Sequence, residues 1–293
     1  MPEPTPTVGS LLAEALRAQP TDRLDLELLL GEVLGLSRAG LLRERDTSVD
    51  ALAAARFADL LNAHRAGRPV AQLLGRREFW SLSLEIDEHV LIPRPDTELL
   101  VETGLRLLGE APPGAIVDLG TGSGAVALAL ASELEGQVVI GIDDSSAALR
   151  VAARNVARLA PRQVRLLRGR WLAALAPASC ALIVSNPPYL EADDPALTAD
   201  GALRYEPTHA LASGPAGLDD LRAIAIAAPR CLMAGGWLAL EHGASQGAAV
   251  RGLLAATGFE HIDTLRDLAG HERVSCGRRP ADLRPVEASD ILR

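Results

Sequence analysis

The sequence predicts an α/β protein in which a doubly wound, mostly parallel sheet follows a small bundle of helices. From residue 115 onward, short apolar runs alternate with helical segments, which is typical of a parallel sheet covered by helices on both faces. Before residue 76, apolar residues instead recur at helical spacing. With 293 residues, the chain has room for one large or two smaller domains. We predict a helical domain over 1–75, a β-hairpin linker over 76–92 and a sheet domain over 93–293.

Composition narrows the classes of function. The formal net charge is −9, so the chain lacks the broad basic face with which proteins grip duplex nucleic acid, although a local patch is not excluded. Lysine is absent, which excludes a Schiff-base lysine enzyme and a P-loop NTPase. Cys180, Cys231 and Cys276 are far apart and odd in number, which argues against a disulfide framework or a zinc site. For the same reason we expect no metal. The chain shows neither a signal-peptide pattern nor a membrane-length apolar run, so we expect a cytoplasmic protein.

Three segments of the helical region carry an apolar stripe. The first passes through Leu11 and Leu16, the second follows Asp22 as a suitable N-cap, and the third spans about Val49–Arg65. Arg68-Pro69 then breaks the pattern. No catalytic combination of residues occurs here, so we expect a bundle that packs on or binds another surface.

The linker and the start of the sheet domain have their own patterns. Residues 76–92 alternate between apolar and polar side chains, which predicts a short hairpin. Two prolines then stiffen the segment IPRPDTELL, where Asp96 or Thr97 is suited to cap a helix that runs to about residue 108.

The strands of the sheet are predicted at the apolar runs, and helices at the segments between most of them. The strands are expected at 115–119, 137–143, 163–169, 181–186, 236–242, 258–267 and 271–277. Helices are expected from about 123, from about 144 to 159, over 218–233, and up to 256. No long helix separates the last two strands, so one of them is expected to be antiparallel.

A glycine-rich turn follows the first of these strands. Gly120, Gly122 and Gly124 stand between strand and helix, where positive φ and close approach to a ligand favour glycine. Asp143 ends the next strand about 20 residues later, where a carboxylate can accept both hydroxyls of a ribose. The spacing G-x-G-x-G is one residue shorter than the dinucleotide fingerprint, which favours a nucleoside ligand without a pyrophosphate. A plain tight turn is the alternative.

This turn and its acidic partner resemble those of the class I S-adenosylmethionine-dependent methyltransferases. The resemblance implies that the cofactor is S-adenosyl-L-methionine rather than NAD. It implies that the turn holds the methionine part of the cofactor and that Asp143 holds the ribose. The residues of the turn are Gly120, Thr121, Gly122, Ser123 and Gly124.

The segment SNPPYL follows the fourth strand, at the sheet edge where the glycine turn also lies. Asn186 offers the carbonyl oxygen of its side-chain amide, and Pro187 offers a backbone C=O without a competing N–H. Two such acceptors can hold a planar –NH2 group by both hydrogens and aim its nitrogen at a methyl donor. Pro188 stiffens the segment, and Tyr189 can pack on the planar group. The alternative is a Pro-Pro turn with no chemical role.

N-P-P-Y resembles the motif of methyltransferases that act on planar nitrogen. The segments GRREFWSLSLEI, VLIPRPDTELLVE, LGTGSGAVALALA, IVSNPPYL, YEPTHAL and LAGHERV together resemble the bacterial release factor glutamine methyltransferases. That family joins a helical domain through a hairpin to a seven-stranded methyltransferase sheet. It methylates the side-chain nitrogen of the Gln in the Gly-Gly-Gln loop of peptide chain release factors. The resemblance therefore implies release factors as protein partners, with the helical domain docking the substrate.

The resemblance also assigns individual residues. It places the cofactor on the glycine turn, Asp143, Trp171 and Asn186, and the substrate Gln on Asn186, Pro187, Pro188 and Tyr189. Trp171 follows the third strand, where an aromatic face can stack on adenine, although an ordinary core role is the alternative. One departure is Arg170, which replaces the family's usual acidic residue and cannot accept a hydrogen bond from the adenine amine.

Two further segments match the family's pattern. Glu206-Pro207 corresponds to its YEP segment, expected in a loop near the substrate. Arg94, Asp96 and Glu98 match the segment before the first sheet-domain helix, where acidic residues are equally explained as favourable first-turn charges.

Three other functions remain open from the sequence. A methyltransferase that modifies a Gln of a ribosomal protein is close, but its segment before the first helix usually differs from IPRP. An adenine methyltransferase acting on DNA or RNA shares the N-P-P-Y chemistry, yet it is expected to carry a basic recognition region. A vestigial, non-enzymatic domain is disfavoured by the intact glycine turn, Asp143 and N-P-P-Y.

Overall fold

The computed structural model describes residues 5–18, 22–159, 163–199 and 201–282. The outermost parts of the two predicted domains, 1–4 and 283–293, lie outside the described residues. The protein divides into two compact units. The first, the helical unit, consists of residues 1–76 together with 199–205, and the second, the sheet unit, consists of 77–198 and 206–293.

The helical unit is a bundle around a leucine-rich core. Its helices are α1 (Val8–Ala18), α2 (Arg23–Leu34), α3 (Arg38–Arg43), α4 (Ala51–Arg65) and α5 (Val70–Leu74). Leu26, Leu29 and Leu30 of α2 are fully buried in this core. The predicted cap at Asp22 is confirmed, because its carboxylate accepts a hydrogen bond from the Leu24 N–H at 2.9 Å. The sequence pattern did not reveal α3 and α5, which have six and five residues and are too short to show a helical period.

A two-stranded hairpin opens the sheet unit, as predicted. Strand β1 (Arg76–Phe79) pairs with β2 (Leu82–Glu85). Trp80 and Ser81 form the two-residue turn between them, with φ of 51° and 58°. Positive φ at both central residues is the geometry of a type I′ turn, whose twist matches that of the strands.

The sheet has seven strands in the order β5-β4-β3-β6-β7-β9-β8, so it is doubly wound as predicted. Strands β3 to β7 run parallel to one another. Strand β9 is antiparallel to both β7 and β8, which confirms the expected reversal near the end of the sequence. The strands are β3 (Ala115–Leu119), β4 (Val139–Asp143), β5 (Val164–Arg168), β6 (Cys180–Ser185), β7 (Leu232–Glu241), β8 (Glu260–Arg266) and β9 (Glu272–Arg278).

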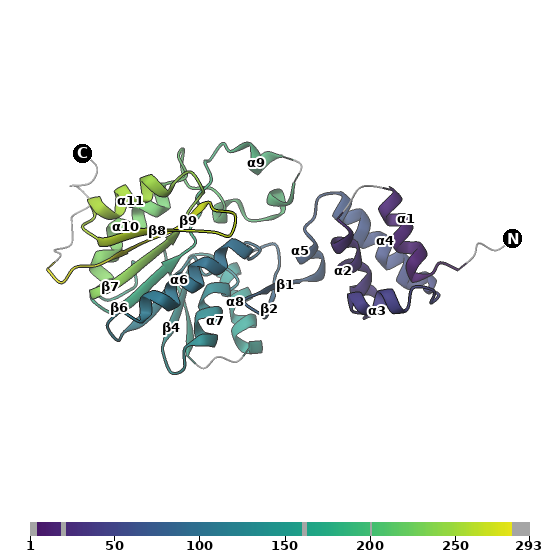
Figure 1. Cartoon of the computed structure of the whole chain (residues 1–293), viewed down its shortest axis with the longest axis horizontal. Coiled ribbons are helices and arrows are strands. Elements are labelled where there is room, and N and C mark those ends of the chain that lie inside the picture. Colours follow the sequence, from purple (N-terminus) through teal and green to yellow (C-terminus); the bar gives the residue numbers. More distant parts are fainter. Residues whose placement is uncertain (1–4, 19–21, 160–162, 200, 283–293) are drawn as a thin grey trace. The chain divides into compact units, whose positions relative to one another are not determined.

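Helices cover both faces of this sheet (Figure 1). Leu182 and Val184 of β6 point toward α6 (Glu98–Leu108), on the face that α7 (Ala125–Glu133) and α8 (Ser146–Leu159) also cover. Ile183 points the other way, into a core formed with α10 (Asp219–Cys231) and α11 (Gly247–Ala256). Short helical turns complete the unit: η1 (Pro95–Thr97), α9 (Pro195–Thr198) and η3 (Thr208–Ala210), while η2 (Ala202–Tyr205) belongs to the helical unit.

One boundary differs from the prediction. The sequence predicts a helix to residue 233 and a strand from 236, but α10 ends at Cys231 and β7 already begins at Leu232. Gly235 has a φ of 79°, and the pairing register with β6 shifts just before Leu182. The strand therefore continues through a bulge, where glycine accepts a backbone conformation that other residues rarely adopt.

All three cysteines are free and buried, as small apolar side chains. Within the described residues, no helix combines the length and the hydropathy that crossing a membrane requires.

Candidate active site

The glycine turn has the conformation that its sequence predicts. Gly120, Gly122 and Gly124 have φ of 70°, 55° and 85°. A side chain on Gly122 would meet almost nothing, since the nearest atom to its hypothetical Cβ is the Gly120 carbonyl oxygen at 4.0 Å. At Gly122 the turn therefore leaves open space beside its backbone, where a ligand can approach closely.

The buried carboxylate of Asp118 holds this turn by hydrogen bonds. Asp118 of β3 accepts hydrogen bonds from the Thr121 hydroxyl at 2.6 Å and from the Ala127 N–H at 3.1 Å. It thereby provides the N-terminal cap that Gly124, which has no side chain, cannot supply to α7. Burial raises the pKa of Asp118 to about 6. Sequence reasoning missed this role, although an acidic residue directly before the turn was a visible signal.

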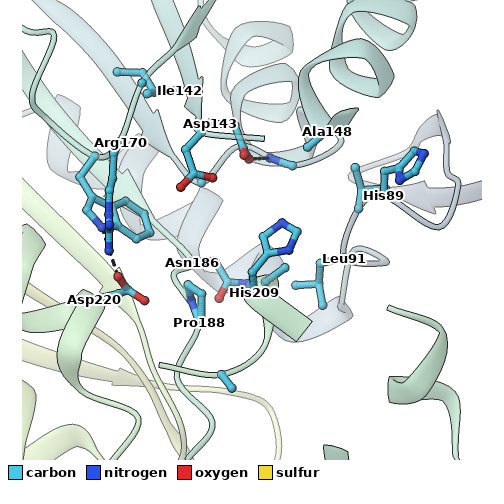
Figure 2. A pocket seen from close by; sticks show the side chains of 18 residues that line it. His89, Leu91, Ile142, Asp143, Ala148, Arg170, Asn186, Pro188, His209 and Asp220 are labelled. Atoms are coloured by element: carbon cyan, nitrogen blue, oxygen red, sulfur yellow. Dashed lines mark hydrogen bonds between the residues drawn. The ribbon is translucent and has the colours of Figure 1, made fainter. Parts of the chain in front are cut away.

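Asp143 ends β4 on the other side of the turn. One of its oxygens accepts the Gly122 N–H and the other accepts the Ser145 N–H, both at 2.9 Å. Burial raises the pKa of this carboxyl. Figure 2 shows the Asp143 carboxylate across the cavity from Asn186 and His209. Each oxygen keeps lone-pair capacity for a further donor, which suits a pair of neighbouring ribose hydroxyls.

Asn186 follows β6 and is half-buried at the edge of the same cavity. The nitrogen of its amide group, Nδ2, donates to the Thr97 hydroxyl at 3.1 Å. Just before it, the Ser185 hydroxyl donates to the Leu119 carbonyl oxygen at 2.8 Å, which joins the ends of β6 and β3. The position of Asn186 relative to the glycine turn is therefore fixed by contacts that join the two strands.

Backbone contacts hold the residues after Asn186. The N–H groups of Tyr189 and Leu190 both donate to the Leu211 carbonyl oxygen, at 3.2 and 2.9 Å. The Tyr189 carbonyl oxygen accepts from the Gln246 amide group at 3.0 Å. Burial, with the Glu241 carboxylate nearby, raises the pKa of the Tyr189 hydroxyl to about 12, so this tyrosine is neutral at physiological pH.

These elements surround a cavity of about 310 Å³, within the range of small-molecule sites. It brings together the sequence-predicted residues Gly120, Gly122, Asp143, Trp171, Asn186 and Pro188 (Figure 2). Other predicted site residues are not part of its lining: Thr121, Ser123, Gly124, Pro187 and Tyr189. Two histidines that sequence reasoning did not single out, His89 and His209, do line it.

The end of the cavity near Trp171 contains a carboxylate. Arg170 lines this end in place of the acidic residue that the resemblance leads one to expect. Asp220, from α10, lines it too and accepts the Trp171 indole N–H at 3.2 Å. The second oxygen of Asp220 accepts the Ser213 hydroxyl at 2.7 Å. Asp220 thus places a hydrogen-bond acceptor at this end of the cavity, where Arg170 can only donate.

The two matched segments beside the cavity are joined by an ion pair. Glu206 has a fully buried side chain that accepts from the Arg94 guanidinium at 2.6 Å and from the Ile92 N–H at 3.0 Å. Asp96 lies 3.3 Å from the Arg273 guanidinium. Thr97 occupies the N-cap position of α6, as predicted, but its side chain makes no cap hydrogen bond. Its hydroxyl binds Asn186 instead, and Asp96 pairs with Arg273.

The arrangement fits S-adenosylmethionine on structural grounds. A carboxylate with free lone pairs, a glycine turn that is open at Gly122 and an indole ring line one cavity, and these are the kinds of group that suit the ribose, the amino-acid part and the adenine of that molecule.

Comparison with known proteins agrees with this geometry. Residues 10–75 match the family model described as PrmC N-terminal domain, and residues 95–214 match the one described as Methyltransferase small domain. The chain is 48% identical to the release factor glutamine methyltransferase of Pseudomonas aeruginosa, over 93% of this chain and 98% of that protein. The protein of the same name from Escherichia coli is 43% identical, over 90% and 94%.

A solved structure, that of a methyltransferase from Pyrococcus furiosus, shares the fold. It is 17% identical, with a TM-score of 0.52 over 78% of this chain and 99% of that one. The fold, the two family models and the near full-length identity lead to one assignment: the chain is an S-adenosylmethionine-dependent methyltransferase and belongs to the release factor glutamine methyltransferase family.

Proposed function

We propose that Asn186 and the residues after it direct a methyl group from S-adenosylmethionine to the side-chain nitrogen of the Gln in the Gly-Gly-Gln loop of peptide chain release factors. One observation carries the proposal. Asn186 stands at the edge of the cavity that Asp143 and the glycine turn also line, and its amide nitrogen is engaged by Thr97. Its carbonyl oxygen, Oδ1, is therefore left to accept from a substrate.

The cofactor-holding residues act by position. Asp143 accepts the two ribose hydroxyls, Trp171 stacks on the adenine, and the backbone of Gly120–Gly124 holds the amino-acid part. Asp220, beside the Trp171 indole, accepts from the adenine amine in place of the residue that is Arg170 here. When bound, the cofactor supplies an electrophilic methyl group.

Asn186 and Pro187 hold the substrate. The amide oxygen of Asn186 and the backbone carbonyl of Pro187 accept the two hydrogens of the Gln –NH2 group. The lone pair of an amide nitrogen is delocalised and weakly nucleophilic, so a fixed orientation contributes much of the rate. The same two acceptors stabilise positive charge as it develops on that nitrogen. The nitrogen afterwards releases one proton to water, so no general base is required.

The helical unit docks the protein substrate in this proposal. A single Gln side chain offers too little surface for specific binding, and a standard interface buries about 800 Å² per partner. Among the described residues, five of the seven large apolar side chains that are exposed lie in the helical unit: Leu16, Leu24, Leu28, Leu42 and Leu52. These exposed leucines are available to contact a protein partner. Because release factors act on ribosomes, we place the activity in the cytoplasm.

The deciding experiment is mass spectrometry of a release factor after incubation with labelled S-adenosylmethionine. We expect one methyl group on the Gln of the Gly-Gly-Gln loop. Asn186→Ala is expected to lower kcat on the order of 100-fold or more, with cofactor affinity nearly unchanged. Asn186→Asp keeps an acceptor but adds a charge, so partial activity is expected. A wild-type rate in Asn186→Ala, or methylation of nucleic acid instead of the release factor, would overturn the proposal.

A further inference from the structure

Behind Asn186, on the side away from the cavity, lies a buried polar cluster. The Asn186 amide nitrogen donates to the hydroxyl of Thr97, which is 5% exposed. Glu241, the last residue of β7, is 1% exposed, and its carboxyl lies close enough to the Thr97 and Asn186 side chains for both to lower its pKa. Three elements that are distant in the sequence, η1, the end of β6 and the end of β7, thus meet behind the residue proposed to hold the substrate.

This cluster determines which way the Asn186 amide faces. The two ends of an asparagine amide have nearly the same shape, but only the nitrogen donates. An ionised carboxylate only accepts, so Glu241 selects the orientation with nitrogen inward and oxygen toward the cavity. In the opposite orientation, the Asn186 –NH2 would face the substrate –NH2, and two donors would oppose each other. Thr97 is compatible with the same orientation of the amide, because its hydroxyl accepts from Asn186 and has one hydrogen to donate to Glu241.

The charge of Glu241 is unusual for so buried a group. Burial raises its pKa to about 7, and hydrogen bonds from Thr97 and Asn186 with the charge of Arg273 limit that rise. The titratable groups that face it are Arg273 from β9, Asp96 from η1 and Tyr189 after β6. One carboxyl oxygen of Glu241, Oε2, has no hydrogen-bond partner among the described residues. A structural carboxylate is normally fully paired, so a partly paired one calls for another explanation.

We propose that Glu241 is a positioning residue for the methyl transfer, which holds the Asn186 amide nitrogen inward, directly and through Thr97, so that the amide oxygen faces the substrate. The inference rests on the function proposed for Asn186. The ionised form of Glu241 also polarises the Asn186 amide, because hydrogen bonds in a series strengthen one another in a low-dielectric interior. The amide oxygen then becomes a stronger acceptor where positive charge develops on the substrate nitrogen.

The first test separates kcat from binding. Glu241→Gln keeps the shape of the side chain and removes the charge. At pH 8 we expect kcat on a release factor to fall about 10- to 100-fold, the usual effect of losing a partner that orients a working group. The KM for the release factor and the affinity for S-adenosylmethionine are expected to stay within about twofold. Glu272→Gln is the matched control: it removes a β9 carboxylate that pairs with Arg251 and Arg266, and it is expected to keep the wild-type kcat.

Two variants of Thr97 test the same arrangement while leaving Glu241 in place. Thr97→Val removes the hydroxyl at constant shape and is expected to lower kcat, whereas Thr97→Ser restores the hydroxyl and the rate. Glu241→Gln and Thr97→Val together are expected to lower kcat by much less than the product of their separate effects, because both act through one amide. If Glu241→Gln does not fold, this pair still decides the question.

A second readout does not depend on activity. The NMR signals of the Asn186 –NH2 group, identified by their loss in Asn186→Ala, should shift with pH around a midpoint near 7 in the wild-type protein. They should not do so in Glu241→Gln. We also expect the kcat of the wild-type protein to fall below about pH 7, where Glu241 becomes protonated. This fall should be absent from Glu241→Gln.

The possible failures are distinguishable. If the wild-type protein does not methylate the release factor Gln, the proposed function itself is wrong. If it does, a wild-type kcat and pH profile in Glu241→Gln overturn the inference alone. A loss of activity in Glu241→Gln that is matched by equal losses of cofactor affinity and thermal stability would also overturn it, since the role would then be structural.

Discussion

The carboxylate of Asp143 is hydrogen-bonded at 2.9 Å to the backbone N–H of Gly122, so the end of β4 holds the turn that follows β3. The residue proposed to hold the ribose therefore also sets the shape of the backbone proposed to hold the rest of the cofactor. Replacing Asp143 disturbs both contacts at once.

We therefore expect Asp143→Ala to weaken S-adenosylmethionine binding strongly. Each hydrogen bond to a charged group contributes roughly 1.5–3 kcal/mol, so losing even one lowers affinity by about 10- to 150-fold. Asp143→Asn retains one acceptor oxygen and should lie between the alanine variant and the wild type. Calorimetric titration with the cofactor measures both, and equal affinity in all three proteins would refute the ribose assignment.

The ion pair of Arg94 and Glu206 predicts a rescue. Glu206 is fully buried, so Arg94→Met leaves its carboxylate without a counter-charge and should cost roughly 3–5 kcal/mol of unfolding free energy. Adding Glu206→Gln removes the unpaired charge and should recover much of that loss. Urea denaturation of the two variants is the measurement. A double variant that is less stable than Arg94→Met would contradict this account.

The raised pKa of Glu241 makes the stability of the folded protein depend on pH. Its folded-state pKa of about 7 exceeds its ordinary value of 4.5, so the neutral carboxyl contributes stability that is complete below pH 4.5 and is lost as the pH rises through 7. Glu241→Gln stays neutral and avoids this loss. Relative to wild type, its unfolding free energy should therefore rise by roughly 3 kcal/mol between pH 4.5 and pH 8. Urea denaturation at the two pH values tests this, and parallel curves would rule it out.

Surface variants test docking by the helical unit better than deletion does. Removing residues 1–73 also removes Ala66 and Gln72, whose carbonyl oxygen and amide group bind Tyr205 at 2.8 and 2.7 Å. Leu42→Ser alters a residue that is 64% exposed and leaves those contacts intact. We expect a higher KM for the full release factor and unchanged activity on a short Gly-Gly-Gln peptide. Leu268→Ser, the same change at a fully exposed position of the sheet unit, is the control; the docking proposal fails if both variants behave alike.

Local patterns in the sequence predicted the sheet well. The strand expected at 115–119 is β3 with the same bounds, and the antiparallel strand near the end of the sequence was also anticipated. These predictions succeed because apolar runs and glycine turns are local signals. The early start of β7 was missed because its first residues, before the bulge at Gly235, resemble the end of a helix.

The support around the candidate site was harder to foresee. Thr97 looks like a helix cap in the sequence, yet its hydroxyl binds Asn186, 89 residues away. Glu241 looks like the polar end of an apolar strand, and nothing near it in the sequence shows that it is buried behind Asn186. Such contacts depend on which strands become neighbours, and that order is set by the whole fold rather than by any local segment.

The division of the protein into units has a consequence for protein engineering. Residues 199–205 belong to the helical unit although they lie between two parts of the sheet unit, so the backbone passes from one unit to the other at three points: 76/77, 198/199 and 205/206. No single cut can release both units whole. A fragment that ends at residue 76 lacks part of its own unit, and a fragment that begins at 77 carries a segment without its partners. A complete helical unit for binding studies would have to be a fusion, in which residues 199–205 are joined to residues 1–76 through a designed linker.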